Sequence, residues 1–118
     1  GIDLKMSGSV PFVDGARIYA LATGVTEAGT VERLVAAGAK RGIPEHEILA
    51  WCDAFEYVQL LRLREQHRQA AAGEGGGGAA NPNVVPLDEL SDLDRRILKE
   101  AMRQVRKLQQ RLELDYPG

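Results

Sequence analysis

Residues 55–69 read FEYVQLLRLREQHRQ, and part-way along this stretch a helix face changes from apolar to polar. At about 100° per residue, Cys52 and Phe55 lie on one narrow line of an α-helix. The same line continues through Arg62 and Gln66, where a core-facing helix would normally stay apolar. The role of this part of the helix therefore depends on what the polar line faces in the folded chain.

Three environments can explain the polar line. The helix end can project beyond the core, with Arg62 laying its aliphatic stem on apolar surface and keeping its charge in water. The line can instead face a polar cleft, into which the side chains of Arg62 and Gln66 point. A third arrangement pairs Arg62 with Asp14 inside a helix bundle. Arg64 points about 160° away from Gln66 and is expected to be merely exposed.

Helical signals account for nearly the whole chain outside one glycine-rich segment. Signals for strands are scarce, because aromatic residues make up only 5% and alternating segments are absent. The sequence predicts an all-α fold, an antiparallel four-helix bundle with room for one extra short helix, as a single domain over residues 1–118. The expected ranges are a leader from an upstream domain at 1–9, helices at 10–24, 30–42, 44–72 and 91–114, and a flexible linker at 73–86.

Composition excludes several classes of protein. The chain has 118 residues, 44% hydrophobic and 27% charged, which suits one folded domain. A net charge of -2 makes nucleic acid an unlikely partner. The sequence has one cysteine, Cys52, which is expected to be a buried thiol in the cytoplasm. No apolar run approaches the ~20 residues that span a bilayer, so no membrane partner is expected.

The first expected helix carries very little charge. Between Val10 and Thr26 the charged residues are Asp14 and Arg17, three apart and therefore adjacent on one helix face. A helix that is apolar nearly all round is expected to be central and buried.

The glycine-rich segment precedes the last helix and reads GEGGGGAANPNVVP over residues 73–86. No Gly-Lys-Ser/Thr follows it and no strand precedes it, which favours a linker over a phosphate-binding loop. Ser91 then suits an N-cap, with Asp94 reaching back as in a capping box. From Arg95 to Arg111 there are seven basic residues and one acid, Glu100. Such a run is either a solvated face or a surface for phosphate or a partner.

Catalytic and metal-binding patterns are weak. His46 and His67 are isolated, and Cys52 lies within the apolar pattern, so neither a nucleophile with its base nor a set of metal ligands is indicated. No catalytic residues and no metal ligands are therefore predicted.

Three separated blocks resemble one known family. They read IDLKMSGSVPFVDGARIYAL at the start, AFEYVQLLRLREQH in the middle and LDELSDLDRRILKEAMRQVRKLQQRL near the end. Together they resemble the C-terminal helical, substrate-binding domain of bacterial signalling nucleotidyltransferases. In that family, paired CBS domains, often with a cyclic-nucleotide-binding-like domain, precede the catalytic core. The combination is similar to the protein-PII uridylyltransferase and glutamine synthetase adenylyltransferase group.

The resemblance implies a set of substrate-binding positions, which is carried over only where this sequence matches. The positions are Asp3, Lys5, Asp14, Arg17, Arg62, Gln66, Arg96 and Lys99, together with the pattern positions Arg64, Arg95 and Glu100. The glycine run departs from the family, in which a shorter polar segment leads to the last helix. Such enzymes hold Mg²⁺ with paired carboxylates soon after a Gly-Ser turn. Here Gly8-Ser9 and the Asp92/Asp94 pair are far apart in the sequence, and we interpret both as coincidence.

The resemblance therefore implies a noncatalytic accessory domain that binds or positions an acceptor beside a separate core. That core, and not this chain, is expected to hold Mg²⁺ and a nucleoside triphosphate, so no cofactor is expected here. The expected partners are the upstream nucleotidyltransferase and CBS domains, with a protein acceptor and a homodimer as further possibilities. The alternative is a helical interaction or dimerisation module without a small-molecule site.

Overall fold

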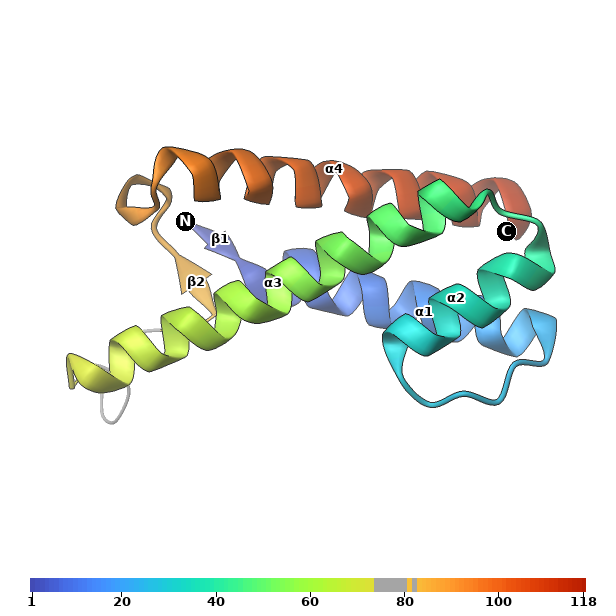
Figure 1. The fold of residues 1–118 in the computed structure, drawn as a ribbon, viewed down its shortest axis with the longest axis horizontal. Coiled ribbons are helices and arrows are strands. Elements are labelled where there is room, and N and C mark those ends of the chain that lie inside the picture. Colours follow the sequence, from blue (N-terminus) through green and yellow to red (C-terminus); the bar gives the residue numbers. More distant parts are fainter. Residues whose placement is uncertain (74–80, 82) are drawn as a thin grey trace.

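The computed structural model describes residues 1–73, 81 and 83–118 and confirms an all-α helical bundle. Its helices are α1 (Val10–Thr23), α2 (Thr30–Arg41), α3 (Glu45–Ala71) and α4 (Asp92–Asp115). In Figure 1, α3 crosses the molecule in the direction opposite to α1 and α4. The connection over 24–29 returns along α1, so that α2 packs against both α1 and α3.

Local sequence signals place the helix ends. Gly24 and Gly42 end α1 and α2 in the left-handed conformation, with φ of 75° and 83°, which glycine adopts without a steric penalty. The Ser91 hydroxyl accepts a hydrogen bond from the Asp94 amide at 3.0 Å and so caps α4 as predicted. The Asp94 carboxylate does not complete a capping box, because it bonds to α3 instead.

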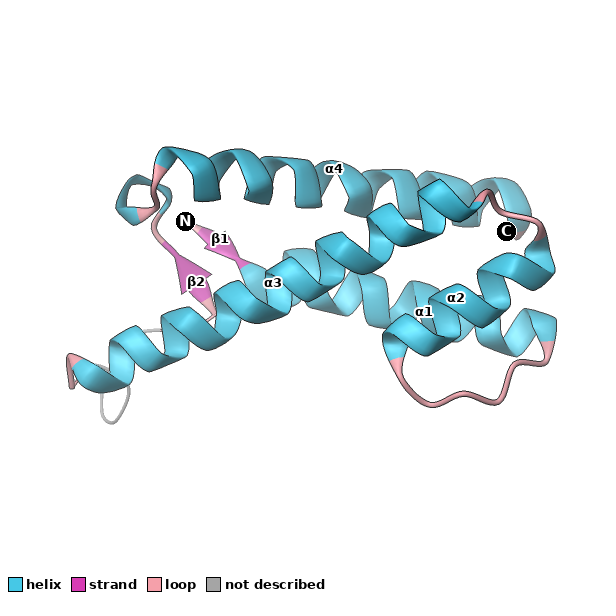
Figure 2. Cartoon of the chain, viewed as in Figure 1, coloured by secondary structure: helices cyan, strands magenta, loops and turns pink. Residues whose placement is uncertain are grey.

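The leader is part of the fold, which the sequence did not indicate. Strand β1 (Ile2–Asp3) pairs antiparallel with β2 (Val84–Val85), with Ile2 opposite Val85. Leu4 is fully buried, and a π-helical turn, η1 (Lys5–Ser9), runs directly into α1. Figure 2 shows the two strands beside the N-terminus. Pairing between two distant two-residue segments leaves no local periodicity, so the scarce β signals of the sequence did not indicate this small sheet.

The predicted linker over 73–86 also contains structure. Its residues 74–80 and 82 lie outside the described residues. Within the described part, residues 84–85 form β2, and a 3₁₀ turn, η2 (Leu87–Glu89), follows before α4 begins.

The core lies between the four helices and is closed at one end by β1 and β2. Phe12 meets Phe55 edge-to-face at 5.9 Å between ring centroids, and Tyr19 stacks on Trp51 at 6.4 Å. Cys52 is 4% exposed, as expected for a buried thiol. Burial and the nearby acid Glu56 raise the pKa of Cys52 to about 11, so the thiol stays protonated at neutral pH.

Helix α1 is not buried on all sides, contrary to the sequence-based expectation. Its outer side exposes Val13, Ile18 and Leu21, the last with 78% of its surface accessible. A four-helix arrangement covers only the faces that meet neighbours, so low charge alone did not make α1 central.

Among the described residues, no helix is long and apolar enough to cross a membrane.

Candidate functional site

Arg62 is held by three side-chain oxygens from three parts of the chain. Its Nε donates to Asn83 Oδ1 at 3.0 Å, and its Nη1 donates to Ser9 Oγ and Gln59 Oε1, both at 3.1 Å. Ser9 Oγ in turn donates to Gln59 Oε1. The guanidinium is therefore fixed in one orientation by contacts from η1, α3 and the segment before β2.

The segments that present these oxygens are themselves tied together. The Leu4 amide donates to the Asn83 carbonyl at 2.8 Å, and the Asn83 amide donates to Asn81 Oδ1 at 2.9 Å. Asn81 Nδ2 donates to Asp3 Oδ2 at 3.4 Å. We call this set, consisting of Asp3, Ser9, Gln59, Arg62, Asn81 and Asn83, the Arg62 network.

The network leaves part of the guanidinium free for a ligand. Within the described part of the chain, Arg62 Nη2 has no protein hydrogen-bond partner. Among the described residues, every oxygen that accepts a hydrogen bond from Arg62 is neutral, so no described carboxylate pairs with its positive charge. A fixed, half-buried arginine with unused donors suits a carboxylate or phosphate oxygen.

The internal Arg62–Asp14 pair does not form. Asp14 Oδ1 instead pairs with Arg17 Nη2 at 3.3 Å on the exposed side of α1, with the two side chains 50% and 59% exposed. Three residues separate these two on one helix, so they meet locally before any contact with α3 is available. The polar line on α3 is thus explained by the Arg62 network and not by a buried ion pair.

Asp3 acts mainly on the backbone of the leader. Its Oδ1 accepts hydrogen bonds from the Lys5 and Met6 amides at 3.0 and 3.1 Å, which fixes the start of η1. The side chain of Lys5 is exposed. Gln66 is also exposed, about 6 Å along the helix axis from Arg62. A ligand on Arg62 Nη2 therefore has a further amide within reach of its other end.

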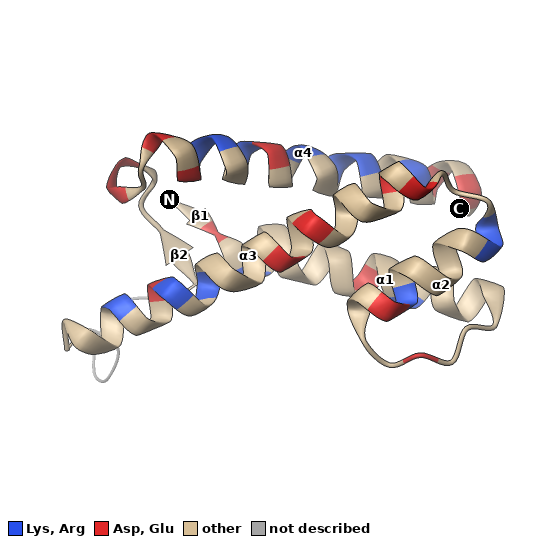
Figure 3. Cartoon of the chain, in the orientation of Figure 1, with Lys and Arg blue, Asp and Glu red and all other residues tan. Residues whose placement is uncertain are grey.

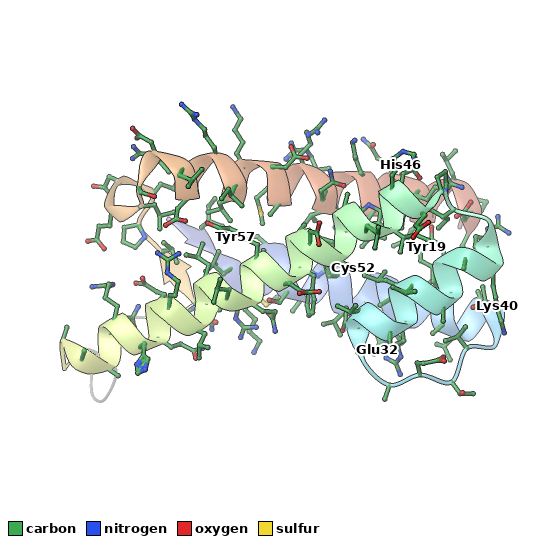
Figure 4. The ribbon with its side chains drawn as sticks, viewed as in Figure 1. Tyr19, Glu32, Lys40, His46, Cys52 and Tyr57 are labelled. Carbon is green, nitrogen blue, oxygen red and sulfur yellow. The ribbon has the colours of Figure 1, made fainter. Side chains whose placement is uncertain are left out.

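Arg64 is not merely exposed, and here the sequence-based expectation was wrong. Its Nη2 pairs with Asp94 Oδ2 at 3.0 Å, and the Tyr57 hydroxyl donates to the Asp94 carbonyl at 3.1 Å. The hydrogen bond from Arg64 lowers the pKa of Asp94. Burial, and the negative charge of the nearby Asp94, raise the pKa of Tyr57 to about 12. In Figure 4, Tyr57 lies between α3 and α4, so this contact joins the two helices.

The remaining predicted positions lie apart from Arg62. Arg96 and Lys99 are exposed on α4, along which Lys and Arg recur as blue segments in Figure 3. Asp92 pairs with Arg95 and Asp94 with Arg64, so each carboxylate already has an arginine partner. The described residues contain no group of three or more His, Cys, Asp or Glu side chains placed to hold a metal ion. Among the predicted positions, hydrogen bonds connect Asp3 with Arg62 through Asn81 and Asn83, and they connect Asp14 directly with Arg17.

Sequence reasoning missed Ser9, Asn81 and Asn83. The two asparagines stand out only as polar residues between the glycine run and two valines. Their contacts with Arg62 and Asp3 span 21 and 78 positions, a separation that helical periodicity does not report.

Comparison with known proteins gives one match. A family model described as "Putative nucleotidyltransferase substrate binding domain" matches residues 1–116. No curated protein matches the chain, and no solved structure does.

Proposed function

Because this chain belongs to the family described as a nucleotidyltransferase substrate-binding domain, we propose that it is a noncatalytic part of such an enzyme and that Arg62 contacts the substrate. The observation that carries the proposal is the guanidinium of Arg62, which is fixed by three neutral oxygens and whose Nη2 has no partner among the described residues. A phosphate or carboxylate of the acceptor, or of the nucleotide, supplies the missing negative charge.

The chemistry of transfer is assigned to a separate catalytic core. Ser9 of the Gly8-Ser9 pair is bonded to Arg62, and Asp92 and Asp94 are both paired with arginines, so neither motif is arranged for metal-assisted transfer. Mg²⁺ and the nucleoside triphosphate belong to the core in this proposal. Upstream CBS and cyclic-nucleotide-binding-like domains, a likeness to the protein-PII uridylyltransferase group, a protein acceptor and a bacterial cytoplasmic location are part of the same proposal.

The experiment uses the full polypeptide that carries this domain. Labelled nucleoside triphosphates are supplied with an extract of the source organism as the pool of acceptors, and transferred label is measured. We expect Arg62→Ala combined with Gln66→Ala to lower transfer at least about tenfold, since charge-assisted contacts to substrate are lost. The KM for the nucleoside triphosphate separates loss of acceptor binding from loss of nucleotide binding.

The matched control changes the same residue types on another helix. Arg103 and Gln109 are exposed on α4, and among the described residues Arg103 pairs with Glu100 alone, one turn away. Arg103→Ala with Gln109→Ala should leave transfer within about twofold of the wild type, as expected for exposed residues. Equal transfer by the Arg62/Gln66 variant and the wild type would exclude the proposed role. Thermal unfolding of the 118-residue chain with Arg62→Ala controls for loss of fold.

The exposed apolar residues of α1 favour a second candidate function, a dimerisation module. Val13, Ile18 and Leu21 are 39%, 42% and 78% exposed on one helix, and a second copy of the chain would bury them. Sedimentation of the wild type and of Leu21→Glu decides this case. A concentration-dependent dimer that the substitution abolishes, with transfer unaffected by Arg62→Ala, would favour dimerisation over substrate binding.

A further inference from the structure

A groove of about 490 Å³ lies between α4, β1 and η2 and is separate from the Arg62 network. Its lining combines apolar and basic side chains from these three elements. The apolar ones are Ile2, Leu87, Leu98 and Met102, and the basic ones are Arg95, Lys99 and Arg106. No carboxylate is among these described lining residues. The groove is thus apolar along its floor and positively charged along one edge.

The basic edge follows from helix geometry. At about 100° per residue, Arg95, Lys99 and Arg106 fall within about 40° of one another, and Met102 falls on the same stripe. The stripe extends about 16 Å along α4. Arg95 is tethered by Asp92 and by the Leu87 carbonyl at 3.4 Å. Lys99 and Arg106 are exposed, and within the described part of the chain neither has a protein partner.

A solvated face is the ordinary explanation for basic residues on a helix. It applies to Arg96 and Lys107, which point about 100° and 120° away from Arg95 and do not line the groove. A solvated face does not account for Lys99 and Arg106, which lie beside Leu98 and Met102 in a groove whose described lining contains no acid. An anion with an apolar part complements both features of this lining.

We propose that this groove binds a small amphiphilic anion, with an apolar or aromatic body against Leu98 and Met102 and a phosphate or carboxylate between Lys99 and Arg106. The volume lies within the range of about 300–1,000 Å³ found for small-molecule sites. A basic stripe of about 16 Å on a chain with a net charge of -2 offers too few contacts for a nucleic-acid backbone.

The groove is a second site and does not depend on the role proposed for Arg62. Successive side chains of a strand point to opposite faces. Ile2 of β1 accordingly lines the groove, whereas the next residue, Asp3, bonds Asn81 in the Arg62 network. A negative result for the groove therefore does not count against the role proposed for Arg62, and a negative result for Arg62 does not count against the groove.

The chain contains a built-in reporter for the groove. It has two methionines, and only Met102 lines this space. A carbon added at Gly8 would lie 3.4 Å from the Met102 methyl, so that methyl is packed between η1 and the groove. Met6 is 60% exposed on η1 and serves as the internal control.

The experiment records ¹³C-methyl methionine spectra of the 118-residue chain during titration with adenosine monophosphate and with octyl phosphate. We expect either probe, or both, to shift the Met102 signal saturably and to leave Met6 in place. Replacing Lys99 and Arg106 by glutamine keeps most of each stem and should weaken binding at least about tenfold, since two charge-assisted contacts are lost. Arg96→Gln with Lys107→Gln removes the same charge from other faces of α4 and should change affinity less than about twofold.

Adenosine, inorganic phosphate and a peptide rich in glutamate and leucine complete the test. Weak binding by adenosine and by phosphate, each lacking one half of the ligand, supports the proposal. Phosphate binding as tight as that of the two main probes would show that the apolar floor plays no part and would overturn it. Binding of the peptide alone would assign the groove to a protein partner instead. Absence of any Met102 shift at millimolar probe, or equal effects of the two double variants, would likewise refute the proposal.

Discussion

Asp115, near the end of α4, accepts hydrogen bonds from side chains on three helices. Its carboxylate accepts from the Tyr19 hydroxyl at 2.8 Å, from Arg41 at 3.2 Å and from Arg111 at 3.3 Å. Burial by itself would raise the pKa of Asp115, but the hydrogen bonds from these three donors outweigh burial and lower it. Burial, and then the hydrogen bond to Asp115, raise the pKa of Tyr19 well above its usual value. One carboxylate thus joins α1, α2 and α4.

Replacing Asp115 by asparagine should lower the free energy of unfolding by about 1–3 kcal/mol at neutral pH, because a 10%-exposed charged acceptor is lost. The native pKa is depressed, so the carboxylate stabilises the fold above its unfolded pKa of about 3.9 and less at lower pH. In urea unfolding, the difference in free energy of unfolding between the wild type and Asp115→Asn should become smaller below about pH 4. Asp14→Asn, in a half-exposed pair, should cost no more than about 0.5 kcal/mol. If the difference between the wild type and Asp115→Asn were the same at every pH, the charge of Asp115 would not be what stabilises the fold.

Helices α1 and α4 approach closely at Gly15. A carbon added at Gly15 would lie 2.9 Å from Leu108 Cδ2 and 3.3 Å from Leu112 Cδ1. Both Gly15 and Leu108 are buried. The absence of a side chain at this position therefore sets how near the two helices lie.

Gly15→Val should destabilise the chain by about 1–3 kcal/mol through overpacking. Valine has a better helix propensity than glycine, so a loss has to come from the contact with α4. Ala22→Val lies on an exposed part of the same helix and should stay within about 0.5 kcal/mol of the wild type. Thermal unfolding of the three proteins measures both effects. Equal stability of Gly15→Val and the wild type would mean that α1 can shift away from α4 without loss.

At the scale of the whole molecule, the first residues of the chain pack against the helices and complete the core. Pairing of β1 with β2 brings the leader beside the segment before α4, and the Leu4 amide bonds to the Asn83 carbonyl at 2.8 Å. Leu4 itself is 0% exposed and belongs to the same core as Trp51 and Leu98. The leader is therefore a structural part of the bundle, and it also carries Asp3 and Ser9 to the Arg62 network.

Leu4→Ala should reduce the free energy of unfolding by about 2–5 kcal/mol, as for other buried leucines. Met6→Ala changes a side chain that is 60% exposed, two positions away, and should cost no more than about 0.5 kcal/mol. Urea denaturation of both variants makes the comparison. Similar stabilities would show that the leader unfolds separately from the four helices, and the Arg62 network would then lack a stable partner at Ser9.

The amino-acid sequence by itself determined the fold class, the glycine ends of α1 and α2, the serine cap of α4 and the burial of Cys52; the N-cap of α2 is Gly29 and not Thr30, which the sequence had suggested. These features depend on neighbours within about one helical turn: glycine at a left-handed helix end, serine at an N-cap, and apolar residues at helical spacing. The three quoted blocks were also sufficient to indicate the family. The polar line through Arg62 was visible in the same way, as a break in the apolar pattern.

Only the tertiary structure decided what that line contacts. Arg62 meets Ser9 across 53 positions and Asn83 across 21, and Tyr19 meets Asp115 across 96. The pairing of β1 with β2, the Arg64–Asp94 contact and the groove beside α4 depend in the same way on where the chain returns. Helical periodicity states which face of a helix is polar. The partner of that face is set by the packing of all four helices and the leader, which no single segment encodes.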